Sequence, residues 1–127
     1  MKTATEITNE LSNFYGTEAY HRFSILFPNV VLTDGANWLA NNGFGWLMDC
    51  IASWQPKALK DPMLREFQLW VLKVNPDKSA VLSCERDTND VAFKQKIPYT
   101  DCPLPELKLY CNPVDETLRC ILLTSEY

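Results

Sequence analysis

The chain has 127 residues, 46% of them apolar and 22% charged, and its formal net charge at pH 7 is −4. This length predicts a single domain over residues 1–127, and the ordinary apolar content argues against long disordered segments. The acidic balance makes direct binding to nucleic acid the less favoured interpretation, because a duplex-binding face is usually basic.

The first predicted element is a helix over Ala4–Tyr15. Thr3 and Glu6 stand three residues apart, which is the spacing of a capping box. In that motif the threonine hydroxyl and the glutamate carboxylate each accept a hydrogen bond from a backbone amide at the start of the helix. Gly16 follows the apolar stripe and predicts the end of this helix.

The segment Thr17–Leu32 has an ambiguous pattern. Phe23, Ile25 and Phe27 alternate as in a strand, although helical spacing also fits part of the segment. Pro28 disfavours a helical conformation at the residue before it. We therefore expect a short extended piece here.

A second helix is predicted to begin after Thr33, whose hydroxyl can cap the first turn. Asp34 follows it, and an acidic residue in the first turn interacts favourably with the helix dipole. Asn41–Gly43 is expected to end this helix, and the main helix of the chain follows at once.

The main helix is predicted over Phe44–Gln55, with the sequence FGWLMDCIASWQ. At helical spacing its apolar side chains cover about two thirds of the circumference, and only Gly45, Asp49 and Ser53 remain on the polar edge. Such a helix must be covered nearly all round, so we expect a sheet to lie against it. Pro56 predicts the end of the helix.

The chain from Glu66 onward changes to the period-two alternation that is typical of strands, after a predicted polar connector over Gln55–Arg65. Five strands are predicted: Glu66–Asn75, Ser79–Glu85, Val91–Ile97, Leu107–Cys111 and Leu118–Thr124. Short polar loops between most of them favour an antiparallel meander. The predicted fold class is therefore α+β: N-terminal helices, mainly within residues 1–55, pack on a C-terminal antiparallel meander sheet of four to five strands within residues 66–124.

The cysteine pattern argues against a metal site and for a reducing compartment. The five cysteines include no Cys-x-x-Cys pair, and the chain has one histidine, so no metal and no cofactor are predicted. The N-terminal segment lacks the apolar core of a secretion signal, and no apolar run approaches the ~20 residues that span a bilayer. We expect a cytoplasmic protein with buried, unpaired thiols and no membrane contact.

The candidate for acid–base chemistry is His21, because a histidine-based general base must be the only histidine of the chain. A small enzyme could use His21 with Asp34 or with Asp49, and a carboxyl beside a dry interior, such as that of Asp49, suits a general acid. No motif of a serine or cysteine nucleophile accompanies these residues. No catalytic residue is therefore assigned, and a structural role is favoured for each of them.

A protein interface is the other use of these residues. Four tryptophans are many for this length, and an exposed one would be a good interface anchor. Trp54, at the end of the main helix, is the candidate for that position. The remaining interaction candidates are Asp49, Tyr20, His21 and Arg22.

A sheet face offers an alternative site for nucleic acid or a small ligand. Lys94 and Lys96 share the wet face of one predicted strand, and Lys108 is expected near them. Tyr110 is the only aromatic residue at a suitable alternate position, and aromatic side chains on a sheet can stack on bases. Lysines also keep an exposed strand soluble, and this structural role is favoured.

Several short motifs follow one another along nearly the whole chain: Thr33–Gly35 (TDG), Trp46–Ser53 (WLMDCIAS), Leu59–Arg65 (LKDPMLR), Ile97–Asp101 (IPYTD) and Ser125–Tyr127 (SEY). In this order they resemble the motifs of a small uncharacterised family, a domain of unknown function that is frequent in cyanobacteria and on phages and plasmids. The resemblance implies no reaction, but the distribution implies a role in host takeover or in evasion of host defence. Members often carry histidine where this chain has Trp54 and phenylalanine where it has Cys102, so an activity that depends on that histidine is in doubt here.

The preferred hypothesis is a small, non-enzymatic cytosolic binding protein that modulates or inhibits a partner protein. Small size, negative charge, aromatic content and the lack of a catalytic constellation support it. An acidic surface would attract a basic, nucleic-acid-handling partner such as a host defence nuclease. The alternatives are a nucleic-acid or small-ligand binder through the sheet face, and a small enzyme.

Overall fold

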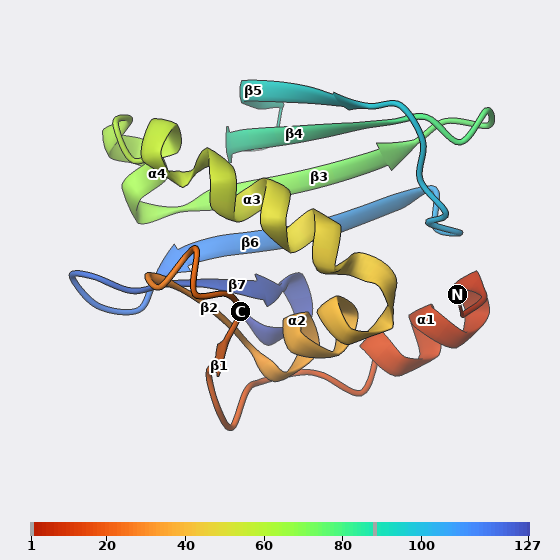
Figure 1. Cartoon of the computed structure of the whole chain (residues 1–127), viewed down its shortest axis with the longest axis horizontal. Coiled ribbons are helices and arrows are strands. Elements are labelled where there is room, and N and C mark those ends of the chain that lie inside the picture. Colours follow the sequence, from red (N-terminus) through yellow and green to blue (C-terminus); the bar gives the residue numbers. More distant parts are fainter. Residues whose placement is uncertain (1, 88) are drawn as a thin grey trace.

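A computed structural model describes residues 2–87 and 89–127 of the chain (Figure 1). Its elements in chain order are α1 (Ala4–Leu11), β1 (His21–Arg22), β2 (Val30–Leu32), α2 (Asp34–Leu39), a π-helical turn (Ala40–Phe44), α3 (Gly45–Ala58), α4 (Pro62–Glu66), β3 (Gln68–Val74), β4 (Ala80–Asp87), β5 (Asp90–Ile97), β6 (Glu106–Pro113), β7 (Arg119–Leu123) and a final 3-10 turn (Thr124–Glu126).

The described strands form one seven-stranded sheet in the order β1-β2-β7-β6-β3-β4-β5. Neighbouring strands are antiparallel except β2 and β7, which run parallel. The α+β class predicted from the sequence is confirmed, and the C-terminal half contributes five strands. Two further strands, β1 and β2, come from the N-terminal part, so the sheet is larger than the four to five strands expected.

The C-terminal strands do not form the simple meander that was expected. After the β3–β4–β5 hairpins the chain returns to the far side of β3, where β6 pairs with it. The connecting segment 98–105 passes the β3–β4 turn, where Thr100 N donates to Lys78 O at 2.8 Å. A fourth strand that comes back beside the first is a Greek key. The proline-rich segment Pro98–Pro105 allows this return because it is too long and too poor in donors to make a tight hairpin.

The N-terminal strands differ from the extended piece expected within Thr17–Leu32. The strand-like alternation of Phe23, Ile25 and Phe27 belongs to a loop, and the strands flank it as β1 and β2. All three residues of β2 are buried between β1 and β7. A short strand buried on both sides has no alternation to reveal it, which explains why the sequence pattern misplaced it.

The capping box at the start of α1 is confirmed. Glu6 N donates to Thr3 Oγ1 and Thr3 N donates to Glu6 Oε1, each at 3.2 Å. The helix ends at Leu11 instead of continuing to Tyr15. Ser12 Oγ donates to the carbonyl of Asn9 at 2.7 Å, and side chains that bond to nearby backbone compete with further helix.

The main helix, α3, continues to Ala58, with Pro56 in its last turn. The helix therefore runs two residues beyond Pro56, where the sequence predicted its end. The segment predicted as a polar connector, Gln55–Arg65, contains the last turn of α3 and most of α4. Proline removes one helical hydrogen bond, but Ala58 beyond it is completely buried, and this packing keeps the turn helical. The short helix α4 follows, and Asp61 caps it by accepting from Met63 N at 2.9 Å.

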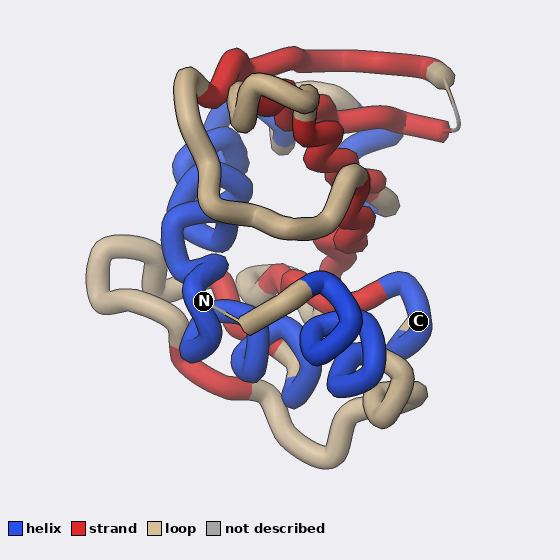
Figure 2. The backbone as a smooth tube through the Cα atoms, turned by 90° about the vertical axis from the view of Figure 1, so that its right-hand side faces the viewer, coloured by secondary structure: helices blue, strands red, loops and turns tan. Residues whose placement is uncertain are grey.

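The main core lies between α3 and one face of the sheet (Figure 1), and Figure 2 shows the helix and the sheet as separate layers. Leu47, Met48 and Ile51 of α3 pack in this core with residues such as Trp70 of β3 and Leu109 of β6. The tryptophans and the cysteine that were expected to widen the dry side of the helix are only half-buried: Trp46, Cys50 and Trp54. The dry side is therefore narrower than predicted.

The opposite side of the sheet carries a separate small core of Val31, Cys120 and Leu122. The buried apolar side chains of α1, α2, α3 and α4 all belong to the first core, so no described helix covers this second side. We call it the open face. Because side chains alternate along a strand, it includes Lys73 of β3, next to core-facing Leu72.

Candidate functional site

The loop between β1 and β2 is built from two consecutive tight turns. Phe27 N donates to Ser24 O at 3.1 Å, and Val30 N donates to Phe27 O at 3.1 Å. Ser24 Oγ also accepts from Leu26 N at 3.1 Å, which is the local bond that serine favours in turns. Arg119 N then donates to Asn29 O at 2.8 Å and ties the loop to β7.

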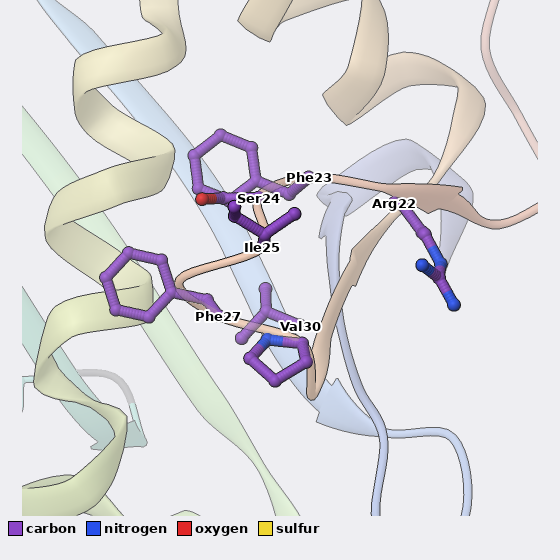
Figure 3. Close-up of a pocket in the computed structure, with 7 residues that line it drawn as sticks. Arg22, Phe23, Ser24, Ile25, Phe27 and Val30 are labelled. Atoms are coloured by element: carbon purple, nitrogen blue, oxygen red, sulfur yellow. The ribbon is translucent and has the colours of Figure 1, made fainter.

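The middle of the first turn presents two large aliphatic side chains to solvent. Ile25 is 94% exposed and Leu26 is 78% exposed. On either side of them, Phe23 and Phe27 stack on each other with ring centroids 6.4 Å apart and pack against the main core. Figure 3 shows both rings directed toward α3. The phenylalanines therefore anchor the loop, and the anchored loop holds Ile25 and Leu26 outward. We call Ser24–Phe27 the apolar turn.

Two depressions flank the apolar turn. One, of about 170 Å³, is lined by Arg22 and the loop itself (Figure 3). The other, of about 230 Å³, lies between the loop and the end of α3, where Leu26 and Pro28 face Pro56 and Leu59. An exposed apolar projection with a hollow on each side can interlock with a complementary protein surface.

His21 and Asp34 lie beside this loop and contact each other. His21 Nε2 and Asp34 Oδ1 are 2.8 Å apart. The second carboxylate oxygen, Asp34 Oδ2, accepts from Glu18 N at 3.0 Å, and Asp34 N donates to Thr17 Oγ1 at 2.9 Å. The pair therefore joins β1 and the preceding segment to the start of α2.

Asp34 carries a pH dependence that follows from these contacts. The hydrogen bond from the Glu18 amide, followed by that with the His21 ring, lowers the pKa of the Asp34 carboxyl below its ordinary value of 3.8. Because the folded state holds the charged form more strongly, the stability from this group is fully present above pH 3.8 and is lost as the pH falls through the lowered pKa.

Asp34→Asn should therefore destabilise the protein at pH 7, and the difference from wild type should shrink at pH 3, as measured by urea unfolding. An equal difference at both pH values would contradict a carboxylate role.

Of the other interaction candidates, Tyr20 and Arg22 flank His21 in the chain, whereas Asp49 lies on α3. Tyr20 is 55% exposed next to His21, and Arg22 is exposed and points away from the phenylalanine rings (Figure 3). Asp49 is exposed on α3, and no hydrogen bond in the described part of the chain joins it to His21.

Trp54 is not the exposed tryptophan that was expected. Its ring stacks on Phe93 of β5 at 5.0 Å, and its Nε1–H donates to Gln95 Oε1 at 2.7 Å. Lys57 Nζ lies 5.3 Å from the centroid of each ring. These contacts dock α3 on the edge strand β5, so the indole is occupied within the fold, and its part in an interface stays a prediction.

The candidates of the alternative site lie together on the open face. Ser83 of β4 pairs with Lys94, and Val81 pairs with Lys96. Tyr110 of β6 pairs with Leu122 of the small core on the same side. The sequence predicted a shared sheet face for these side chains, and the structure adds that β3 and β4 lie between their strands.

The thiols are protected rather than reactive. Burial raises the pKa of the Cys84 thiol to about 12 and that of the Cys111 thiol to about 11, so both are protonated at neutral pH and are poor nucleophiles. In the described ranges, no group of three histidine, cysteine or acidic side chains is arranged to hold a metal ion. The protonated thiols of Cys84 and Cys111 therefore supply no nucleophile to the His21–Asp34 pair.

The apolar turn was missed at the sequence level because its residues resemble a strand. The available signal was Ser24 together with Pro28, two turn-forming residues that enclose apolar side chains. Without the fold, an alternating apolar segment is more simply interpreted as half-buried.

No helix in residues 2–87 and 89–127 has the length and apolar character required to cross a membrane.

Comparison with known proteins gives a family but no function. No curated protein and no solved structure matches the chain. A family model described as a family of unknown function (DUF6876) matches residues 5–127. The chain therefore belongs to this family of unknown function.

Proposed function

We propose that the chain is a small binding protein that docks on a partner protein through the apolar turn. The observation that carries the proposal is the exposure of Ile25 (94%) and Leu26 (78%) on a loop that is held in shape by its own hydrogen bonds and by two anchored phenylalanines. Burying a side chain of this size contributes roughly 1.5–3 kcal/mol. A pre-formed loop loses little conformational entropy on binding, so more of this gain remains as affinity.

The chemistry of the partner is inferred from charge and composition. The formal net charge of −4 favours a basic partner, such as a nucleic-acid-handling protein, through faster association. A host defence nuclease met by a phage or mobile-element factor is one such partner, and inhibition would follow if docking covers its active site. A cytoplasmic location is part of the proposal and agrees with five unpaired cysteines.

Substitution of the turn tests the proposal. Ile25→Ser/Leu26→Ser should retain the fold, because both side chains are exposed and changes at such positions are usually within ±0.5 kcal/mol each. In affinity capture from cells that encode the protein, wild type should retain a stoichiometric partner and the double variant should lose it. Met63→Ser, which removes an apolar side chain that is 56% exposed on α4, should retain the partner. Retention by the double variant, or no stoichiometric partner for wild type, would refute docking through this turn.

A second candidate, a small enzyme, rests on the 2.8 Å contact between His21 and Asp34. A carboxylate that orients a histidine is one part of a general-base arrangement. A screen with generic ester, peptide and phosphodiester substrates tests this candidate. Activity that is present in wild type and lost in His21→Gln would support it, and inactivity of wild type toward all three classes would count against it.

A further inference from the structure

The open face collects four lysines from three strands, β3, β5 and β6, and β4 lies between β3 and β5. Lys96 of β5 is opposite Val81 of β4, which is opposite Lys73 of β3. In the next row, Ser83 of β4 stands opposite Lys94 on one side and Val71 on the other, and Val71 is opposite Lys108 of β6. With strands about 4.8 Å apart, the members of the first row are roughly 10 Å apart and those of the second roughly 14 Å.

The charges of these lysines are largely unpaired. No ion pair forms within residues 2–87 and 89–127 for Lys73, Lys94 or Lys96, and Lys108 has one, with Glu106 at 3.5 Å. Glu106 also stands opposite Lys73 in the sheet. Glu85, on the same face, is buried and accepts from Asn89 N at 2.9 Å. Half of the eight lysines thus gather on one face of an acidic chain, which points to an anionic ligand with several charges.

Aromatic rings continue the same face next to the lysines. Tyr110 is two residues beyond Lys108 on β6, and therefore on the same side at a distance of roughly 7 Å along the strand. Its ring contacts those of Phe67 and Tyr127, with centroids 4.9 and 5.2 Å apart. Tyr127 is 79% exposed, so this ring is free to stack on a planar group from solvent.

We propose that the open face binds a short stretch of single-stranded nucleic acid. Phosphates lie on Lys73, Lys94, Lys96 and Lys108, and a base stacks on Tyr127. Cationic grooves flanked by stacking rings are the general solution for single strands, because every base has a π face and the backbone is charged. An acidic peptide would satisfy the lysines but would leave the rings unused, and a duplex keeps its bases stacked inside. This site is separate from the apolar turn, and the two tests use different residues.

Fluorescence anisotropy with a labelled 12-nucleotide oligouridylate tests the proposal in the full chain. With four phosphate contacts, the slope of log K against log salt should be about −3, so affinity should fall roughly 50-fold between 50 and 200 mM KCl. Lys94→Gln/Lys96→Gln should halve the slope and weaken binding at 50 mM about tenfold. Tyr127→Ala should weaken binding roughly tenfold through lost stacking.

The matched control is Lys2→Gln/Lys60→Gln, which changes the net charge equally at two exposed lysines away from the open face. It should bind within about twofold of wild type, because the rest of the surface takes no part. Absence of binding at 50 mM KCl, or equal losses in both double variants, would overturn the proposal. So would competition by an oligoglutamate, or binding of a duplex of the same length, as strong as that of the single strand.

Discussion

Replacing Glu126 with alanine is expected to be among the most destabilising single changes in the chain. This buried carboxylate accepts three hydrogen bonds: from Thr33 Oγ1 at 2.6 Å, from Gly35 N at 3.0 Å and from Leu123 N at 3.0 Å. Each donor would lose a charged acceptor in a place that water reaches poorly. The expected loss is about 3–4 kcal/mol, and the Tm should fall by roughly 10–15 °C.

The control for this prediction is Glu116→Ala, which removes the same side chain from an exposed position in the β6–β7 loop. Its effect should stay within about 0.5 kcal/mol. Urea unfolding of both variants measures the difference. A loss below about 1 kcal/mol for Glu126→Ala would show that the three donors find other acceptors. Gly35 belongs to the same arrangement, because a β-carbon there would lie 2.5 Å from Leu123 Cδ1 and 2.7 Å from Glu126 Oε1.

Replacing Gln68 with leucine should also cost about 3–4 kcal/mol. Gln68 and Gln55 are buried and exchange two hydrogen bonds of 2.9 Å between their side-chain amides. Gln68 Oε1 also accepts from Trp70 Nε1 at 2.9 Å, and Gln68 Nε2 donates to Leu64 O at 3.1 Å. Leucine has a similar size but leaves Trp70 Nε1 and Gln55 Oε1 without a partner. Gln55 Nε2 keeps its bond to Ile51 O, and Leu64 O keeps its bond from Arg119.

The double variant Gln55→Leu/Gln68→Leu separates hydrogen bonding from packing. Removal of both partners eliminates the unpaired amide that each single variant leaves behind. The double variant should therefore be more stable than the sum of the two single losses predicts, by about 1–2 kcal/mol. Additive losses in urea unfolding would mean that the two amides contribute independently.

Local signals in the sequence predicted the parts of the fold that local chemistry determines. The caps of α1 and α2 depend on residues three positions apart, and both form: Thr3 with Glu6, and Thr33 with Ala36 N at 3.3 Å. The five C-terminal strands also follow from alternation within each segment. These predictions succeeded because each element carries its own pattern.

The misplaced elements depend on partners far along the chain. Trp54 finds Gln95, which is 41 residues away, and no helical periodicity shows that an edge strand will cover that side. The last turn of α3 persists past Pro56 because Ala58 is completely buried. In both cases tertiary packing outweighs the local preference.

The candidate surfaces were predicted in part. His21, Asp34, Lys94, Lys96 and Tyr110 were all singled out from the sequence. Alternation placed Lys94, Lys96 and Tyr110 on a sheet face. The order of the strands between them, and the contact between His21 and Asp34, depend on tertiary packing that a single sequence does not show. The apolar turn could not be predicted from its pattern, because exposure of Ile25 and Leu26 depends on which side of the loop faces the core.

The parallel pairing of β2 with β7 has a consequence for how the protein is made. Glu126 follows its partner Thr33 by 93 residues, which is roughly 5–20 s of translation. During that interval Val30–Leu32 has emerged from the ribosome without the strand that will cover it. We expect the sheet to close only after Arg119–Leu123 has left the ribosome, and we expect Val30–Leu32 to be a chaperone target in the meantime.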